Sequence, residues 1–190
     1  MALSDTELIH KAQHGDTLAF EELVFRYDKR VLSIALKYVR DKDDAKDIYQ
    51  EVFIRVFKSL KNFQFRSEFS TWLFRITTNV CLTYSSKVNK RVNVPINDEF
   101  DEEQPDGVVL EAEQDFYSPE KVFSGIEINQ KINDAVETLS PKQKMIFIMK
   151  HFEGFKLREI AVMMDCQEGT AKKYLFEANH KMRKLLKNVY

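Results

Sequence analysis

Residues 157–185, LREIAVMMDCQEGTAKKYLFEANHKMRKL, decide the fold of the carboxy-terminal part of the chain. A first apolar stripe repeats at three- and four-residue steps and comprises Leu157, Ile160, Ala161 and Met164. The period breaks at residues 165–167. A second stripe then comprises Ala171, Leu175, Ala178, Met182 and Leu185. Two short helices joined by a tight turn form a helix-turn-helix, whose second helix can enter a DNA major groove. Periodicity alone equally allows a helical hairpin with a solvated outer face.

The rest of the chain also has helical periodicity. Ser4 and Glu7 have capping-box spacing at the start of a helix that Gly15 ends. Apolar stripes predict further helices over about 16–38, from residue 43 or 44 to residue 60, and over about 71–89. The pair at residues 140–141, Ser-Pro, predicts another helix start. With only 5 glycines and 4 prolines, the sequence predicts an all-α fold.

Charge divides the chain into three parts. Residues 93–117 contain nine acidic residues and no lysine or arginine, so this segment alone has a formal charge of −9. The whole chain has a formal net charge of only −1. The remaining +8 divides equally between residues 1–92 and 118–190, +4 each. The pattern predicts two small helical domains joined by a flexible acidic linker. Modestly basic domains fit a nucleic-acid partner but indicate one only weakly.

Several classes of protein are disfavoured. No apolar run approaches the ~20 residues of a membrane span. The first ten residues contain Asp5 and Glu7, whereas a signal peptide would have basic residues there. We therefore expect a cytoplasmic protein without membrane insertion. Cys81 and Cys166 have no nearby cysteine or histidine cluster, so neither a disulfide framework nor a zinc site is expected. No glycine-rich phosphate loop, nucleophile elbow or metal-ligand spacing is present. We expect no enzyme activity, no metal and no cofactor.

Five motifs, in order along the chain, carry a resemblance to a known family. Residues 44–53, DAKDIYQEVF, and residues 69–76, FSTWLFRI, with Asn79, are followed by residues 139–141, LSP, 153–161, EGFKLREIA, and 168–172, EGTAK. These motifs resemble extracytoplasmic-function (ECF) RNA polymerase sigma factors. The resemblance implies sigma domain 2 at residues 1–92 and the helix-turn-helix sigma domain 4 at residues 118–190. It also implies binding to core RNA polymerase and promoter DNA, with an anti-sigma factor as a further partner.

The resemblance implies three sets of site residues. The set that would dock on the coiled coil of the largest polymerase subunit comprises Asp47, Gln50 and Glu51. The set that would read and melt the -10 element comprises Phe65, Arg66, Ser67, Phe69, Arg75, Asn79, Lys87, Lys90 and Arg91. The set that would read the -35 element, while the carboxy-terminal domain sits on the polymerase flap, comprises Arg158, Thr170, Lys172, Lys173, Phe176 and Lys181. Aromatic and cationic side chains suit unstacked bases, and lysines suit phosphates or guanine. Trp72 is interpreted as a core residue.

Some positions depart from the family pattern. Tyr174 and Glu177 stand where arginines are common, and Glu177 could accept from a cytosine amino group or have only a solvated or intrahelical role. The acidic linker would thread into polymerase, or act only as a tether. Two rival functions remain: a stand-alone helix-turn-helix regulator, and a sigma-like decoy that binds an anti-sigma factor.

Overall fold

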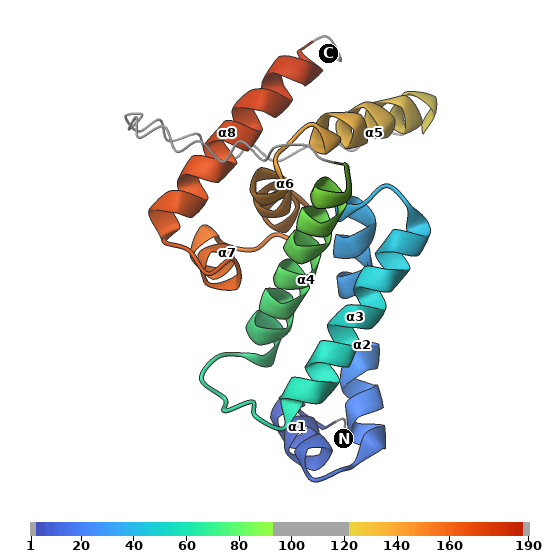
Figure 1. The fold of residues 1–190 in the computed structure, drawn as a ribbon, viewed down its shortest axis with the longest axis vertical. Coiled ribbons are helices and arrows are strands. Elements are labelled where there is room, and N and C mark those ends of the chain that lie inside the picture. The colour runs from blue at the N-terminus through green and yellow to red at the C-terminus, as the bar shows by residue number, and fades with distance from the viewer. Residues whose placement is uncertain (1–2, 93–121, 188–190) are drawn as a thin grey trace.

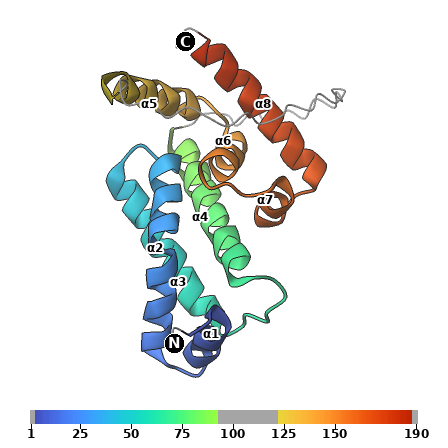
Figure 2. The same cartoon turned by 180° about the vertical axis from the view of Figure 1, so that it is seen from behind.

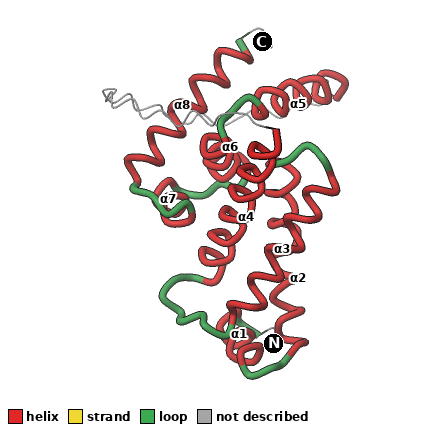
Figure 3. The backbone as a smooth tube through the Cα atoms, in the orientation of Figure 1, coloured by secondary structure: helices red, strands yellow, loops and turns green. Residues whose placement is uncertain are grey.

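The structure is a computed structural model that describes residues 3–92 and 122–187. Every regular element within those ranges is a helix, as Figure 3 shows, which confirms the predicted all-α class. The elements are α1 (Asp5–Gln13), α2 (Thr17–Tyr38), α3 (Lys42–Leu60), α4 (Phe69–Val92), α5 (Val122–Glu137), α6 (Pro141–Phe147), the π-helical turn η2 (Ile148–Phe152), α7 (Leu157–Met163) and α8 (Glu168–Leu186).

Side-chain caps set the starts of the first three helices. Ser4 and Glu7 form the predicted capping box of α1. Asp16 accepts a hydrogen bond from the Ala19 amide at the start of α2. Asp41 accepts from two amides at the start of α3, which therefore begins at residue 42 and not at 43 or 44. The fourth helix is longer than predicted, since it spans Phe69–Val92 in place of about 71–89.

The carboxy-terminal helices also begin and turn where the sequence predicts. Ser140 and Gln143 form a capping box, with Pro141 in the first turn of α6. After η2, Gly154 has φ +74°, a conformation that glycine adopts without steric cost. Helices α7 and α8 form the helix-turn-helix, and Asp165 in the turn has φ +55°. Met163, the last residue of α7, is buried, whereas Met164, which the sequence stripe included, lies in the turn and is only partly buried.

The two halves of the chain pack directly on each other. Helices α1 to α4 form a bundle, and α7 and α6 lie against α4, as Figures 1 and 2 show from opposite sides. A single cluster of buried residues runs from α1 through α4 into α6, η2, α7 and α8. A smaller cluster lies between α5, α6 and α8. The described residues therefore form one continuous body, which the sequence did not predict.

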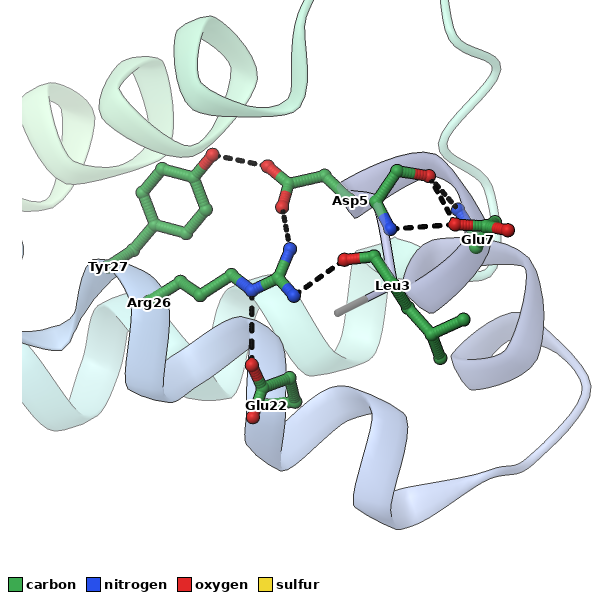
Figure 4. Close-up of polar contacts among 7 residues, drawn as sticks. Leu3, Asp5, Glu7, Glu22, Arg26 and Tyr27 are labelled. Carbon is green, nitrogen blue, oxygen red and sulfur yellow. Dashed lines mark hydrogen bonds and ion pairs between the residues drawn. The ribbon is translucent and has the colours of Figure 1, made fainter. Parts of the chain in front are cut away.

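The amino terminus of α1 is fixed to α2 by a polar network (Figure 4). The guanidinium of Arg26 donates to Asp5 at 2.7 Å, to the Leu3 carbonyl at 2.6 Å and to Glu22 at 3.2 Å. The Tyr27 hydroxyl donates to the other carboxylate oxygen of Asp5. Burial, together with this bond to Asp5, raises the pKa of Tyr27. Because Leu8 and Ile9 are also buried, α1 has a fixed position on the bundle.

Candidate polymerase and nucleic-acid interfaces

The predicted polymerase-binding residues share one outer face of α3. Asp47 and Gln50 are exposed, and Glu51 is partly exposed and accepts from Arg55 Nε at 2.7 Å. Two apolar side chains extend this face by one and two helical turns: Ile54 is 46% exposed and Phe57 is 60% exposed. We call Asp47, Gln50, Glu51, Ile54 and Phe57 the α3 face. Sequence periodicity placed Phe57 in the apolar stripe, whose residues are ordinarily buried, and assigned no role to Ile54.

A loop between α3 and α4 places the next set. Phe63 is 7% exposed and Phe69 is 5% exposed, so both anchor the loop in the core. Between them Phe65, Arg66 and Ser67 are exposed. Phe65 has φ +56°, which is unusual for a residue with a side chain, and 38% of it is accessible. The loop therefore presents one aromatic and one cationic side chain to solvent between two buried anchors.

Phe69 differs from the sequence prediction because its ring is buried and cannot stack on a base in this conformation. It packs against Tyr27, with ring centroids 5.4 Å apart, and against Trp72 at 5.7 Å. Trp72 also lies 4.9 Å from Phe63 and packs against the core, as predicted. Phe69 belongs to the support of the loop and not to its outer surface.

Helix α4 carries the remaining residues predicted to contact the -10 element. Arg75, Asn79 and Lys87 are exposed. Arg75 Nη2 lies 2.8 Å from an Asp165 carboxylate oxygen, in the turn of the helix-turn-helix. Lys90 and Arg91 fall on the last residues of α4, and the predictions about their side chains lie outside the described residues, as does the acidic linker.

The first turns of α8 present part of the predicted -35 set. Thr170 lies three residues after the N-cap Gln167. Lys172 is exposed and pairs with Glu168 at 3.1 Å on the same helix. Phe176 is 53% exposed. Lys173, one position along from Lys172, is partly buried, and Arg158 is exposed on α7.

Two residues of α8 make contacts that the sequence did not predict. Lys181 Nζ donates to the Thr138 carbonyl at 2.7 Å, so its ammonium binds the end of α5. Glu177 accepts from Gln143 Nε2 at 2.8 Å and thereby joins α8 to α6. Neither the base-reading role nor the solvated role considered for Glu177 describes this arrangement. The carboxylate therefore positions α8 within the bundle.

A set of contacts that we call the interhelix clasp holds the two halves together. The Glu153 side chain is only 7% exposed. Its carboxylate accepts from Arg30 Nε and from Ser33 Oγ, both at 3.3 Å, and lies 3.7 Å from Lys37 Nζ. The Arg30 guanidinium also lies 4.8 Å from the ring centroids of both Phe74 and Phe155. The clasp fixes the helix-turn-helix half against α2 and α4.

The cysteines and acidic side chains of the described ranges offer little catalytic chemistry. Burial raises the pKa of Cys81 to about 12, and burial also raises the pKa of Cys166, so neither thiol favours the reactive thiolate. Within residues 3–92 and 122–187, no group of three or more His, Cys, Asp or Glu side chains could hold a metal ion. No helix in these ranges is long and apolar enough to cross a membrane.

Comparison with known proteins places this arrangement in a family. The Sigma-70 region 2 family matches residues 23–91, and the Sigma-70 region 4 family matches residues 129–181. RNA polymerase sigma-H factor of Pseudomonas aeruginosa is 30% identical over 182 residues, which cover 96% of this chain and 93% of that protein. ECF RNA polymerase sigma-E factor of Escherichia coli strain K12 is 32% identical over 177 residues, 93% of this chain and 91% of that protein.

Solved structures agree on the fold. CnrH in complex with the cytosolic domain of CnrY has a TM-score of 0.67 at 18% identity and covers 97% of each chain. The sigma factor RpoE of Bartonella quintana, in complex with the anti-sigma factor NepR, has a TM-score of 0.63 at 21% identity, over 88% of this chain and 96% of that one. The two family matches and the sigma-H and sigma-E relatives define a protein that acts with RNA polymerase in transcription initiation. The chain belongs to the ECF RNA polymerase sigma factors.

Proposed function

We propose that this sigma factor divides promoter recognition between a front domain at residues 1–92 and a rear domain at residues 118–190, joined by the acidic segment 93–117. The front domain binds core polymerase and the melted -10 element, and the rear domain reads the duplex -35 element. Attachment to polymerase presents both domains to DNA at high effective concentration, so neither requires high affinity alone. The observation that carries the proposal is the loop in which exposed Phe65 and Arg66 stand between two buried phenylalanines.

The α3 face suits a protein partner. Exposed apolar side chains beside charged ones are typical of an interface core and its rim. Ile54 and Phe57 supply the apolar part, and Asp47, Gln50 and Glu51 supply the polar part. We assign this face to the coiled coil of the largest polymerase subunit.

The loop suits an unstacked base. Aromatic stacking contributes ~1–3 kcal/mol per base, which is comparable to the few kcal/mol needed to extrude a nucleotide. Phe65 offers a ring that is 38% exposed, and Arg66 and Ser67 stand beside it for backbone contacts. Arg75, Asn79 and Lys87 on α4 would extend the contact along the strand.

The start of α8 suits a duplex. Thr170 and Lys172 lie in its first two turns, where a recognition helix meets base edges and phosphates, with Phe176 exposed one turn further. Lys173 and Arg158 complete this surface. Lys181 would have to break its hydrogen bond to the Thr138 carbonyl to reach a phosphate. We therefore assign Lys181 to the contact between α8 and the end of α5 and not to DNA binding.

We further propose that the protein works in the cytoplasm by binding and not by catalysis, and that an anti-sigma factor restrains it. Thiols with raised pKa values and the lack of a metal-ligand cluster in the described ranges support a binding role. Anti-sigma restraint is supported by the two structural relatives, each held by a partner protein. The bond between Arg75 and Asp165 indicates that Arg75 must leave the rear domain before it contacts DNA.

The proposal is tested with holoenzyme on single-stranded DNA enriched from a random pool by the wild-type holoenzyme. Phe65→Ala with Arg66→Ala should lower DNA affinity by about tenfold or more, the size of one stacked base, without changing affinity for core polymerase. Phe25→Ala is the matched control, because Phe25 is 71% exposed on α2 and lies outside the loop. Equal DNA affinities for all three proteins would contradict the proposed function.

A further inference from the structure

Helix α1 contacts the candidate base-capturing loop at two points, through side chains that neither the motifs nor the family resemblance singles out. Gln13 Nε2 donates to the Leu60 carbonyl at 3.0 Å and to the Phe63 carbonyl at 2.9 Å. His10 stacks on Phe65, with ring centroids 4.6 Å apart and an interplanar angle of 29°. The loop therefore bonds to α1 at its start and stacks on α1 near its tip.

The first contact fixes where the loop leaves α3. The two carbonyls belong to Leu60, the last residue of α3, and to the buried anchor Phe63, whose amide also donates to the Leu60 carbonyl at 3.0 Å. The side-chain amide of Gln13 therefore joins α1 to both ends of this turn. Gln13 is only partly exposed, so its bonds are screened from water better than a surface contact would be.

The second contact fixes the direction of the Phe65 ring. Phe65 adopts φ +56°, a region that costs energy for a residue with a side chain and persists only when its surroundings hold it. His10 covers one face of the ring, and Phe63 meets it edge-on at 5.0 Å. The ring nevertheless stays 38% exposed, which leaves surface for a further stacked group.

Helix α1 is itself a rigid support. Its amino terminus is fixed by Asp5, which bonds Arg26 and Tyr27 of α2 (Figure 4). Tyr27 in turn packs edge-on against Phe69, where the loop ends. The same α2 segment therefore holds both α1 and the far end of the loop.

We infer that His10 and Gln13 are positioning residues of the base-capturing loop, and that an extruded DNA base stacks on Phe65 as the third member of a His10–Phe65–base stack. The inference rests on the proposed function of the loop. It adds that α1 sets the geometry in which the loop receives the base. A nucleobase is the ligand that fits, because every base has a π-face and stacking tolerates different sequences.

The test uses full-length protein assembled with core polymerase and single-stranded DNA enriched from a random pool by the wild-type holoenzyme. His10→Ala and Gln13→Ala should each lower DNA affinity by about three- to tenfold, as expected for one lost stack or one lost pair of hydrogen bonds. His10→Phe should restore wild-type affinity, because it keeps a ring against Phe65. The unfolding midpoint of both His10 variants should stay at the wild-type value, since His10 is exposed.

A spectroscopic readout checks the loop separately. Trp72 is the single tryptophan of the chain, and its ring centroid lies 4.9 Å from that of Phe63. Its fluorescence emission therefore reports on the buried start of the loop. Gln13→Ala should shift that emission and increase quenching by acrylamide, and Glu21→Ala at an exposed position of α2 should not.

The outcomes separate this inference from the proposed function. If Phe65→Ala itself leaves DNA affinity unchanged, the proposed function of the loop is wrong. If Phe65→Ala weakens binding but His10→Ala and Gln13→Ala do not, only the positioning role is wrong. A gain in affinity for His10→Ala would also overturn the inference, because His10 would then shield Phe65 from the base. Failure of His10→Phe to rescue would overturn the proposed stack.

Discussion

Replacing Glu153 with alanine should weaken the packing between the two halves of the chain by about 1–2 kcal/mol. The carboxylate is 7% exposed and accepts from Arg30 and Ser33, with Lys37 close by. Hydrogen bonds to charged groups contribute about 1.5–3 kcal/mol, and truncating one partner of a buried pair costs more. Arg30 and Lys37 are 43% and 32% exposed, so water rehydrates them after the substitution and reduces the loss. The equilibrium between packed and separated halves should therefore shift about 5- to 30-fold.

The assay is energy transfer between dyes on the two halves, followed through a urea titration. The dyes are attached at Lys58→Cys on α3 and Lys184→Cys on α8, both exposed positions, with Cys166→Ser to prevent side labelling and Cys81 left in the core. Glu153→Ala should separate the halves at lower urea than wild type.

The matched control is Glu22→Ala, which removes a carboxylate that is 48% exposed and pairs with Arg26 one helical turn away. It should change the separation midpoint little, because exposed pairs within one helix contribute about 0.3–0.5 kcal/mol. If the two variants had the same midpoint, the clasp would not hold the halves together as its geometry indicates.

Three further predictions address the polymerase surface, the duplex surface and pH. Asp47→Ala with Glu51→Ala should lower affinity for core polymerase about tenfold, measured by fluorescence anisotropy, because the substitutions remove the charged part of the α3 face; an unchanged dissociation constant would contradict that assignment. Lys172→Ala with Lys173→Ala should weaken holoenzyme binding to duplex -35 DNA and lower its salt dependence by one or two counterions, without affecting core binding. Equal loss of DNA binding and core binding would contradict this division of the sites. The pKa of His151 is lowered by burial, so the unfolded chain binds a proton more readily than the folded one. The contribution of His151 to stability should therefore be constant above about pH 7 and fall as the pH decreases through 6.5 toward the folded pKa. His151→Gln should reduce the slope of stability against pH in this range, measured by urea unfolding at a series of pH values; an unaltered slope would mean that another group titrates.

Local signals in the sequence predict the elements well. The Ser4–Glu7 capping box forms as the spacing predicts, and a helix begins at Ser140 and Pro141 as the pair predicts. Such features depend on residues a few positions apart, which the sequence displays directly. The helix-turn-helix is found for the same reason, since its two stripes and the break between them lie within residues 157–185.

Surface roles of apolar residues could not be predicted from periodicity. Phe57 falls on the same repeat as the partly buried Phe53 and the buried Val56, yet 60% of it is exposed. Phe69 shows the reverse error, because a place in a loop motif suggested exposure and the ring is 5% exposed. Which face of an amphipathic helix meets a neighbour depends on tertiary packing. When the apolar stripe is wide, the sequence does not tell which of its residues are buried and which stay exposed.

Contacts between residues far apart in the chain also could not be predicted from the sequence. Gln13 bonds residues about 50 positions away, and Arg30 and Glu153 lie 123 positions apart. No local pattern distinguishes a surface glutamine that bonds a loop from one that bonds water. The candidate polymerase and DNA residues could be named in advance only because the motifs resemble a known family, and their roles remain proposals.

The most direct measurement of the central claim is transcription by purified core polymerase, with and without this chain, on a pool of random promoters, with sequencing of the transcripts that start. If the chain is a sigma factor that joins two DNA-reading surfaces through polymerase, transcripts should arise only with the chain present and should share two upstream elements at a fixed spacing. Substitution of Phe65 should alter the element nearer the start site, and substitution of Lys172 should alter the more distant one. Failure of the chain to bind core polymerase, or starts without shared elements, would contradict the account.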